Sequence, residues 1–236
     1  FLGYHSHIGS QIFDKQAYVA EIEKLMQFTK EMQTEYDIHI SALNLGGGFA
    51  ALYTNADHPI PLQDVCHTIL DTCKKENAKQ QLNIEKIMIE PGRSIVAEAG
   101  STLCRVGYQK QTEHKKYIFV DGGMSDNIRP ALYQAEYACD IANRMQEDKT
   151  ETVTIAGKCC ESGDILIENA KLPKVSQNDL LIIYTTGAYG YSMASNYNKL
   201  GRPAVVFVKD GHARVVIKKE SYENMLDLEC NEVINV

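Results

Sequence analysis

The chain has 236 residues, of which 44% are hydrophobic and 23% are charged, and its formal net charge is −7. This is the composition of a folded protein and excludes a disordered chain. The acidic balance, with no block of lysines or arginines, argues against nucleic acid or an anionic membrane as a partner and favours a small-molecule ligand. Seven cysteines, without a C-x-x-C pair or a zinc-type spacing, indicate a reduced, cytoplasmic protein.

Strand and helix signals alternate over residues 1 to about 92, which favours βα units and a parallel sheet. In chain order we expect a strand that ends near Gly9, a helix over 15–35, a buried strand within 40–49, a helix over 62–79 and a strand within 85–93. Apolar residues at helical spacing mark the core-facing side of the first helix. Each of the three strands ends in a polar or glycine-rich stretch.

The pattern changes after Arg93 to short β-type runs separated by turn residues. These runs include 116–121, 152–157, 179–187, 204–211 and 213–217. Asp210-Gly211 predicts a hairpin between the last two runs, and SDNIRPALYQ predicts a capped helical turn between strands. We therefore expect two domains, an α/β domain over 1–94 and an all-β domain over 95–236.

The stretch HSHIGSQ, His5 to Gln11, permits two readings. Two histidines at i and i+2 on a strand point to the same face, which is a metal-ligand spacing, whereas the glycine and serine that follow are typical of a phosphate-binding turn. A metal site of this kind needs further histidines and an aspartate at later strand ends. The other five histidines do not have that placement, so we expect no metal.

Two other strand ends in the first half carry possible ligand-binding residues. Gly46, Gly47 and Gly48 leave three bare amides that can converge on a phosphate, although a glycine triplet is also common in a simple turn. The stretch EPGR adds Glu90 and Arg93 at the end of the next strand. A parallel barrel places its working residues there, and a surface salt bridge is the alternative.

The second half contains its own candidates. Arg129 and Tyr133 lie four residues apart and share one face if the segment is helical. Cys160 stands beside Glu161 after a strand, where it is either a small core residue or an exposed reactive thiol. Tyr189 lies between glycines that allow its hydroxyl to reach a ligand, with simple packing as the alternative.

Taken in order, the motifs HSHIGSQ, LNLGGGF, IEPGRS, VDGGMSDNIRPALY, CESGD and GAYGYSM closely resemble those of the diaminopimelate decarboxylase family, within the alanine racemase-like, fold-type III pyridoxal phosphate enzymes. The resemblance covers essentially the whole chain. It implies that the first domain is the closing part of a (β/α)8 barrel that binds pyridoxal 5′-phosphate, and that the second is a C-terminal β-barrel domain carrying the Cys-Glu and Gly-Ala-Tyr loops.

The resemblance also implies residue roles. It assigns cofactor binding to His7, Ser10, Gly46, Gly47, Gly48, Glu90, Gly92, Arg93 and Tyr189. In these roles His7 stacks on the pyridine ring and Glu90 faces the pyridine nitrogen, which keeps the cofactor an effective electron sink. The metal reading of the histidine pair thus gives way to a cofactor wall.

The implied reaction is the decarboxylation of meso-2,6-diaminopimelate to L-lysine, a step of lysine biosynthesis. Cys160 resembles the family's proton donor. The distal ammonium of the substrate calls for an anion, for which Glu161 is suited, and its distal carboxylate calls for Arg129 and Arg93, with Tyr133 and Tyr189 assisting. In the family Cys160 and Glu161 act across the two-fold interface of a homodimer with shared active sites.

Two departures qualify the resemblance. The family's Schiff-base lysine belongs to an early barrel strand, and no lysine here stands in a matching motif, so we expect the C-terminal half to three-fifths of the enzyme, inactive by itself. The stretch GKCCES also lacks the proline and small apolar residue that usually precede CES. A non-catalytic regulatory homologue, and a decarboxylase acting on carboxynorspermidine or arginine, remain as alternatives.

Overall fold

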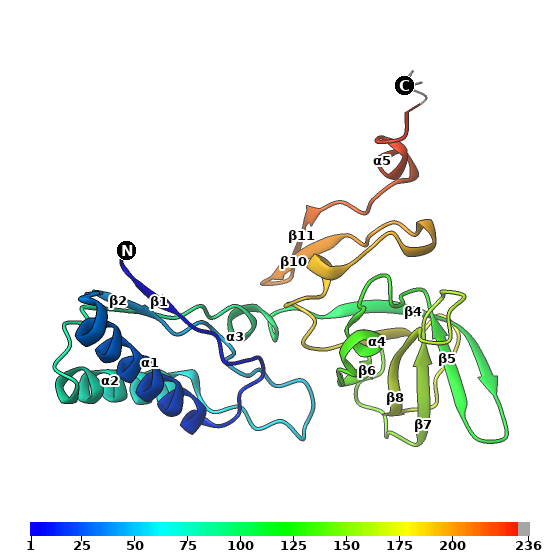
Figure 1. Cartoon of the computed structure of the whole chain (residues 1–236). Coiled ribbons are helices and arrows are strands. Elements are labelled where there is room, and N and C mark those ends of the chain that lie inside the picture. The colour runs from blue at the N-terminus through cyan, green and yellow to red at the C-terminus, as the bar shows by residue number, and fades with distance from the viewer. Residues whose placement is uncertain (231–236) are drawn as a thin grey trace. The chain divides into compact units, whose positions relative to one another are not determined.

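A computed structural model describes residues 1–230 of the chain. The chain forms two compact units, Phe1–Ala99 and a second unit that begins at Gly100 (Figure 1). No helix within the described residues combines the length and the apolar character needed to cross a membrane.

The first unit is a three-stranded parallel sheet covered by helices. Its strands run in the order β1-β2-β3 and its elements are β1 (Gly3–His5), α1 (Lys15–Tyr36), β2 (Ala42–Asn44), α2 (Leu62–Lys79), β3 (Lys86–Met88) and α3 (Arg93–Val96). The expected βα order is present, and both long helices lie where the apolar periodicity predicts them. The first strand ends at His5 rather than near Gly9, because its pairing with β2 ends at His5 and Asn44 and the chain after β2 turns at Gly46 (φ 63°).

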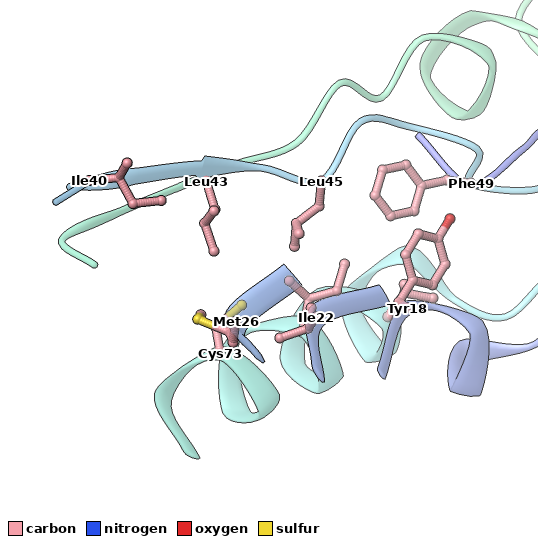
Figure 2. Close-up of a cluster of buried hydrophobic side chains, with 10 residues drawn as sticks. Tyr18, Ile22, Met26, Ile40, Leu43, Leu45, Phe49 and Cys73 are labelled. Atoms are coloured by element: carbon pink, nitrogen blue, oxygen red, sulfur yellow. The ribbon is translucent and has the colours of Figure 1, made fainter. Parts of the chain in front are cut away.

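Helix α1 packs its apolar side against β2 and α2 (Figure 2). Ile22 and Met26 of α1 and Leu43 of β2 are fully buried, and Tyr18 stacks on Phe49 with ring centroids 5.3 Å apart. Burial of each such side chain stabilises the fold by about 1.5 to 3 kcal/mol. This core also includes Leu45 and Phe49, so it packs against the residues that directly follow β2.

The second unit is built on a six-stranded sheet in the order β6-β9-β4-β5-β7-β8. The strands are β4 (Thr102–Gln111), β5 (Lys116–Val120), β6 (Cys139–Ile141), β7 (Glu151–Ala156), β8 (Ile165–Leu172) and β9 (Leu180–Ile183). All neighbours are antiparallel except β5 and β7. The edge strands β6 and β8 lie close to each other, so the sheet is a nearly closed barrel, and the β fold expected of this half is confirmed.

Shorter elements complete this unit. A separate hairpin joins β10 (Val205–Lys209) to β11 (His212–Ile217), and its turn residues Asp210 and Gly211 both have positive φ, as the Asp-Gly signal predicts. The remaining elements are α4 (Arg129–Tyr133), η1 (Tyr191–Met193), η2 (Tyr197–Lys199) and α5 (Tyr222–Leu226). The helical turn α4 lies where it was expected, and its N-cap Ile128 has no capping oxygen. The side-chain oxygen of Asn127, one residue earlier, accepts from the amide of Arg129 at 3.3 Å, and a proline in the first turn removes one of the other amides that a cap would satisfy.

Candidate active site

Glu90 is held by residues from two neighbouring strand ends. Because β1, β2 and β3 are parallel, the residues at and after their carboxyl ends meet at one edge of the sheet. Asn44 donates from Nδ2 to Glu90 Oε1 at 2.7 Å, and His5 Nε2 lies 3.5 Å from Glu90 Oε2. The edge therefore presents a carboxylate whose orientation is fixed by an amide and an imidazole.

The glycine loop lies beside this carboxylate. Gly46 (φ 63°) and Gly48 (φ 92°) are left-handed, and a Cβ on Gly46 would come within 2.8 Å of His7 Nδ1, so only glycine fits there. The amide of Gly46 donates to Asn44 Oδ1 at 3.0 Å, and the amide of Gly47 donates to His7 Nδ1 at 3.1 Å. Two of the three amides expected at a phosphate thus hold the loop itself together.

His7 gains a defined orientation from the same contact. Because its Nδ1 accepts from Gly47, the neutral ring carries its proton on Nε2 and is fixed against the glycine loop. Ser6, between the two histidines, donates instead to Glu21 of α1. Burial raises the pKa of Glu21, and the hydrogen bond from Ser6 opposes that shift. Ser10 lies three residues beyond His7 and is exposed.

Arg93 opens helix α3 and is preceded by Gly92, the exposed N-cap residue. Its Nη1 donates to the hydroxyl of Tyr53 at 2.5 Å, and its guanidinium lies 5.5 Å from the centre of the Tyr53 ring. Tyr53 is forty residues away in the chain, and no sequence pattern points to it. The first unit therefore orients this arginine through a long-range aromatic contact.

Arg129 is the buried cation of the second unit, with 7% of its surface exposed. Its Nη1 donates to the hydroxyl of Tyr137 at 2.6 Å, and its guanidinium lies 5.7 Å from the Tyr137 ring and 6.0 Å from the Tyr189 ring. Tyr189 has a positive φ of 60°, a conformation that costs a tyrosine energy and is common at ligand sites. Tyr133, four residues after Arg129 on α4, is exposed.

Cys160 and Glu161 lie on the short connection between β7 and β8, and both are exposed. Cys160 is therefore an exposed thiol and not a small core residue. Glu161 Oε1 accepts from the amide of Gly163 at 3.1 Å, which turns the loop back on itself. The carboxylate of Asp164, within the same CESGD motif, is buried.

The expected site residues thus form two sets, one on each unit. The first set contains His7, Ser10, Gly46, Gly47, Gly48, Glu90, Gly92 and Arg93, and the second contains Arg129, Tyr133, Cys160, Glu161 and Tyr189. Asn44 and Tyr137 are additional members that the motif reading missed, although Asn44 stands within LNLGGGF. Among the described residues, no group of three or more histidine, cysteine or acidic side chains is arranged to hold a metal ion.

Comparison with known sequences identifies the class of protein. The profile of the family described as "Pyridoxal-dependent decarboxylase, C-terminal sheet domain" matches residues 17–187. The chain belongs to this family of pyridoxal-dependent decarboxylases.

The chain is also similar to several curated proteins that share the name diaminopimelate decarboxylase. The chain is 50% identical over 229 residues to diaminopimelate decarboxylase of Bacillus subtilis (strain 168), covering 97% of this chain and 52% of that protein. It is 47% identical to diaminopimelate decarboxylase of Staphylococcus aureus (strain COL), covering 95% of this chain and 52% of that protein. The chain thus spans about half the length of the curated relatives it matches.

Solved structures agree in fold. Diaminopimelate decarboxylase from M. jannaschii in complex with L-lysine superposes with a TM-score of 0.90 at 35% identity, over 98% of this chain and 52% of that one. Lysine/ornithine decarboxylase from Vibrio vulnificus, in complex with cadaverine, gives a TM-score of 0.73 at 26% identity, over 85% of this chain and 53% of that one.

The first unit suits pyridoxal phosphate in the chemistry of its side chains. Glu90 offers an anion for a protonated pyridine nitrogen, and His7 offers a flat ring of fixed orientation. Next to them is the glycine loop, where a Cβ on Gly46 would collide with His7 and Ser6. A carboxylate, an imidazole and a side-chain-free turn at one strand edge are what a charged, planar, phosphorylated cofactor requires.

Proposed function

We propose that this chain takes part in the decarboxylation of meso-2,6-diaminopimelate to L-lysine, with pyridoxal 5′-phosphate as cofactor. The observation that carries the proposal is the buried Arg129, oriented by Tyr137 beside Tyr189. A substrate with a distal carboxylate has a use for such a cation, whereas the lone distal ammonium of an ornithine-type substrate would be repelled by it. The names of the relatives support the same substrate.

In this proposal the first unit binds and tunes the cofactor. Pyridoxal phosphate, when bound, supplies an electron sink for the pair of electrons left when carbon dioxide departs. With the cofactor bound, Glu90 would face the pyridine nitrogen and hold a proton there, and His7 would lie against the ring. Ser10, Gly92 and the turn at Gly48 line the phosphate end, and Gly46 and Gly47 keep that turn in place.

The second unit acts on the substrate. In this role the thiol of Cys160 would deliver a proton to the α-carbon that carbon dioxide has left, and the thiolate would regain its proton from solvent. The product is lysine. Glu161 receives the distal ammonium. Arg129 receives the distal carboxylate, with Arg93, Tyr133 and the Tyr189 hydroxyl as further donors.

The active assembly is proposed to be a cytoplasmic homodimer with shared active sites. The seven cysteines are all free thiols, which fits a reducing compartment. No lysine of this sequence stands in the motif of the residue that binds the cofactor covalently in the family, so in this proposal activity belongs to the full-length protein. For the same reason, this chain by itself is expected to be inactive.

The proposal is tested by measuring carbon dioxide release and product formation by the full-length protein with added pyridoxal phosphate. Meso-diaminopimelate, ornithine, arginine and carboxynorspermidine are compared at equal concentrations. We expect lysine from diaminopimelate, with kcat/KM at least about 30-fold above that of the other three, because one misplaced charge in a desolvated site costs about 2 to 5 kcal/mol or more. A preference for another substrate would overturn the assignment, and no turnover of any would favour the regulatory homologue.

A further inference from the structure

Asp164 is the most deeply buried carboxylate near the proposed proton donor, with 2% of its surface exposed. It ends the CESGD motif and precedes β8, four residues after Cys160. Its side chain is closed off from solvent there. A buried carboxylate needs hydrogen-bond donors, so its partners define what it does.

Both oxygens of Asp164 accept backbone hydrogen bonds from two different loops. Oδ1 accepts from the amide of Met124 at 2.6 Å, and Oδ2 accepts from the amide of Cys159 at 2.7 Å. Met124 belongs to the VDGGMSDN stretch that follows β5, whereas Cys159 is the neighbour of Cys160. One side chain therefore ties the loop of the proposed proton donor to a second loop of the same unit.

Backbone hydrogen bonds also hold the loop over residues 157–164, which carries Cys160. The amide of Gly157 donates to the carbonyl of Asp164 at 2.9 Å, and the amide of Asp164 donates to the carbonyl of Glu161 at 3.1 Å. The amide of Lys158 donates to the carbonyl of Gly122 at 3.2 Å. The loop is thus short, closed and attached to the 122–124 segment, although Cys160 and Glu161 themselves are exposed.

Two glycines make room for the carboxylate. A Cβ on Gly123 would lie 2.9 Å from Asp164 Oδ2, closer than real Cβ contacts come, and a Cβ on Gly157 would collide with both carboxylate oxygens. The presence of glycine at both positions follows from the place that Asp164 occupies.

From these contacts we infer that Asp164 is a positioning residue for Cys160, which rests on the proposed function of that thiol. The backbone of Cys159 is fixed by Asp164, and this fixes where the next residue, Cys160, presents its sulfur. An aspartate is required because two amides point at it. An asparagine has a single acceptor oxygen and would turn its NH2 group toward one of the two amides.

The test uses the full-length holoenzyme with Asp164→Asn and, as a matched control, Glu168→Gln, which removes an exposed carboxylate of β8 that pairs with exposed Lys115. We expect Asp164→Asn to lower kcat by about 10- to 100-fold with KM changed less than about threefold, because a small misplacement of a reacting group acts mainly on the chemical step. Glu168→Gln is expected to match the wild type. Wild-type kcat for Asp164→Asn would overturn the inference.

A second comparison separates positioning from general damage. In a Cys160→Ala background, Asp164→Asn should add no further loss, since the group that it positions is gone. An equal loss in both backgrounds would mean that Asp164 merely supports the fold, and would overturn the inference. If Cys160→Ala alone keeps full activity, the proposed role of Cys160 fails, and this outcome is distinct from a failure of Asp164.

A third readout does not depend on activity. Iodoacetamide should alkylate Cys160 several-fold faster in Asp164→Asn than in the wild type, measured on the peptide by mass spectrometry, because the loop is released. Gly123→Ala displaces the Asp164 carboxylate without removing it. If Asp164→Asn does not fold, the same measurements are made on Gly123→Ala. Unchanged kcat together with an unchanged alkylation rate in Gly123→Ala would count against the inference.

Discussion

Asn44 and Glu90 join the ends of two neighbouring parallel strands through a hydrogen bond of 2.7 Å from Asn44 Nδ2 to Glu90 Oε1. The same asparagine accepts the amide of Gly46 with its Oδ1 at 3.0 Å. One side chain therefore orients both the carboxylate and the first residue of the glycine loop. Replacement of Asn44 is therefore expected to disturb both the carboxylate and the glycine loop, whereas replacement of Glu90 removes only the carboxylate.

Replacement of Glu90 by Gln in the full-length protein should lower kcat by about 100-fold or more, because the negative charge that holds a proton on the pyridine nitrogen is lost. Asn44→Ala should lower kcat less, by about tenfold, and should also weaken cofactor binding, because the carboxylate stays while its orientation and the loop are loosened. Steady-state kinetics and equilibrium dialysis with pyridoxal phosphate measure the two effects. A kcat of Glu90→Gln equal to that of the wild type would refute the role given to Glu90.

Replacement of Arg129 by Ala should reduce kcat/KM for diaminopimelate by the equivalent of about 2 to 5 kcal/mol, since a desolvated charge pair with the distal carboxylate is lost. Arg129→Lys keeps the charge but loses the planar fork that Tyr137 orients, so we expect an intermediate value. Arg105→Ala removes an exposed arginine of β4 and serves as the control. Unchanged turnover of diaminopimelate by Arg129→Ala contradicts the assignment of the distal carboxylate.

Much of the first unit could be predicted because its signals are local. Helix α2 begins and ends at the expected residues, since Pro61 precedes it, Asp64 lies in its first turn and Lys79 in its last. Strand β4 was not among the expected runs, because Gly107 and several polar residues interrupt its apolar pattern, and only its pairing with β5 and β9 makes it a strand.

The candidate site could be predicted only where its residues stand in one short motif. The loop of Gly46 to Gly48 and the pair of Cys160 and Glu161 are of this kind. Tyr137 orients Arg129 and Tyr53 orients Arg93 through contacts that depend on tertiary packing, eight and forty residues apart in the chain. Sequence spacing does not encode such contacts, so the residues that orient the two arginines were missed.

Asp179 provides a prediction for stability and pH. Burial by itself would raise the pKa of this carboxyl, but hydrogen bonds from Arg144, the amide of Ser176 and Asn143 outweigh it and hold the pKa below its usual 3.8. A lowered pKa in the folded state contributes stability that is present above 3.8 and is lost as the pH falls through the folded-state pKa.

Asp179→Asn should therefore lower the free energy of unfolding near neutral pH by about 1.5 to 3 kcal/mol, the range for a hydrogen bond to a charged group. The difference from the wild type should shrink once the pH falls below 3.8. Urea unfolding followed by circular dichroism measures it. Glu147→Gln removes the exposed carboxylate that pairs with the same Arg144 and should change stability by less than about 1 kcal/mol. An Asp179→Asn effect that does not depend on pH would rule out the electrostatic explanation.

The proposed homodimer predicts complementation between two strongly impaired variants. Glu90→Gln carries its lesion in the first unit, and Cys160→Ala carries its lesion in the second unit. If the cofactor set of one subunit works with Cys160 and Glu161 of its partner, each mixed dimer has one site with both lesions and one site with none. If each subunit uses its own Cys160, every site in a mixed dimer has one lesion and nothing is restored.

Mixing the two full-length variants under conditions of subunit exchange should therefore recover about half of the wild-type activity per mixed dimer, and about a quarter of it in a statistical 1:1 mixture in which half of the dimers are mixed. Native mass spectrometry measures the fraction of mixed dimers, and the recovered rate should scale with that fraction. Each variant mixed with itself is the control for reactivation by handling. Mixed dimers that form in the expected proportion but stay inactive would place Cys160 in the site of its own subunit, because no other arrangement leaves every site with a single lesion.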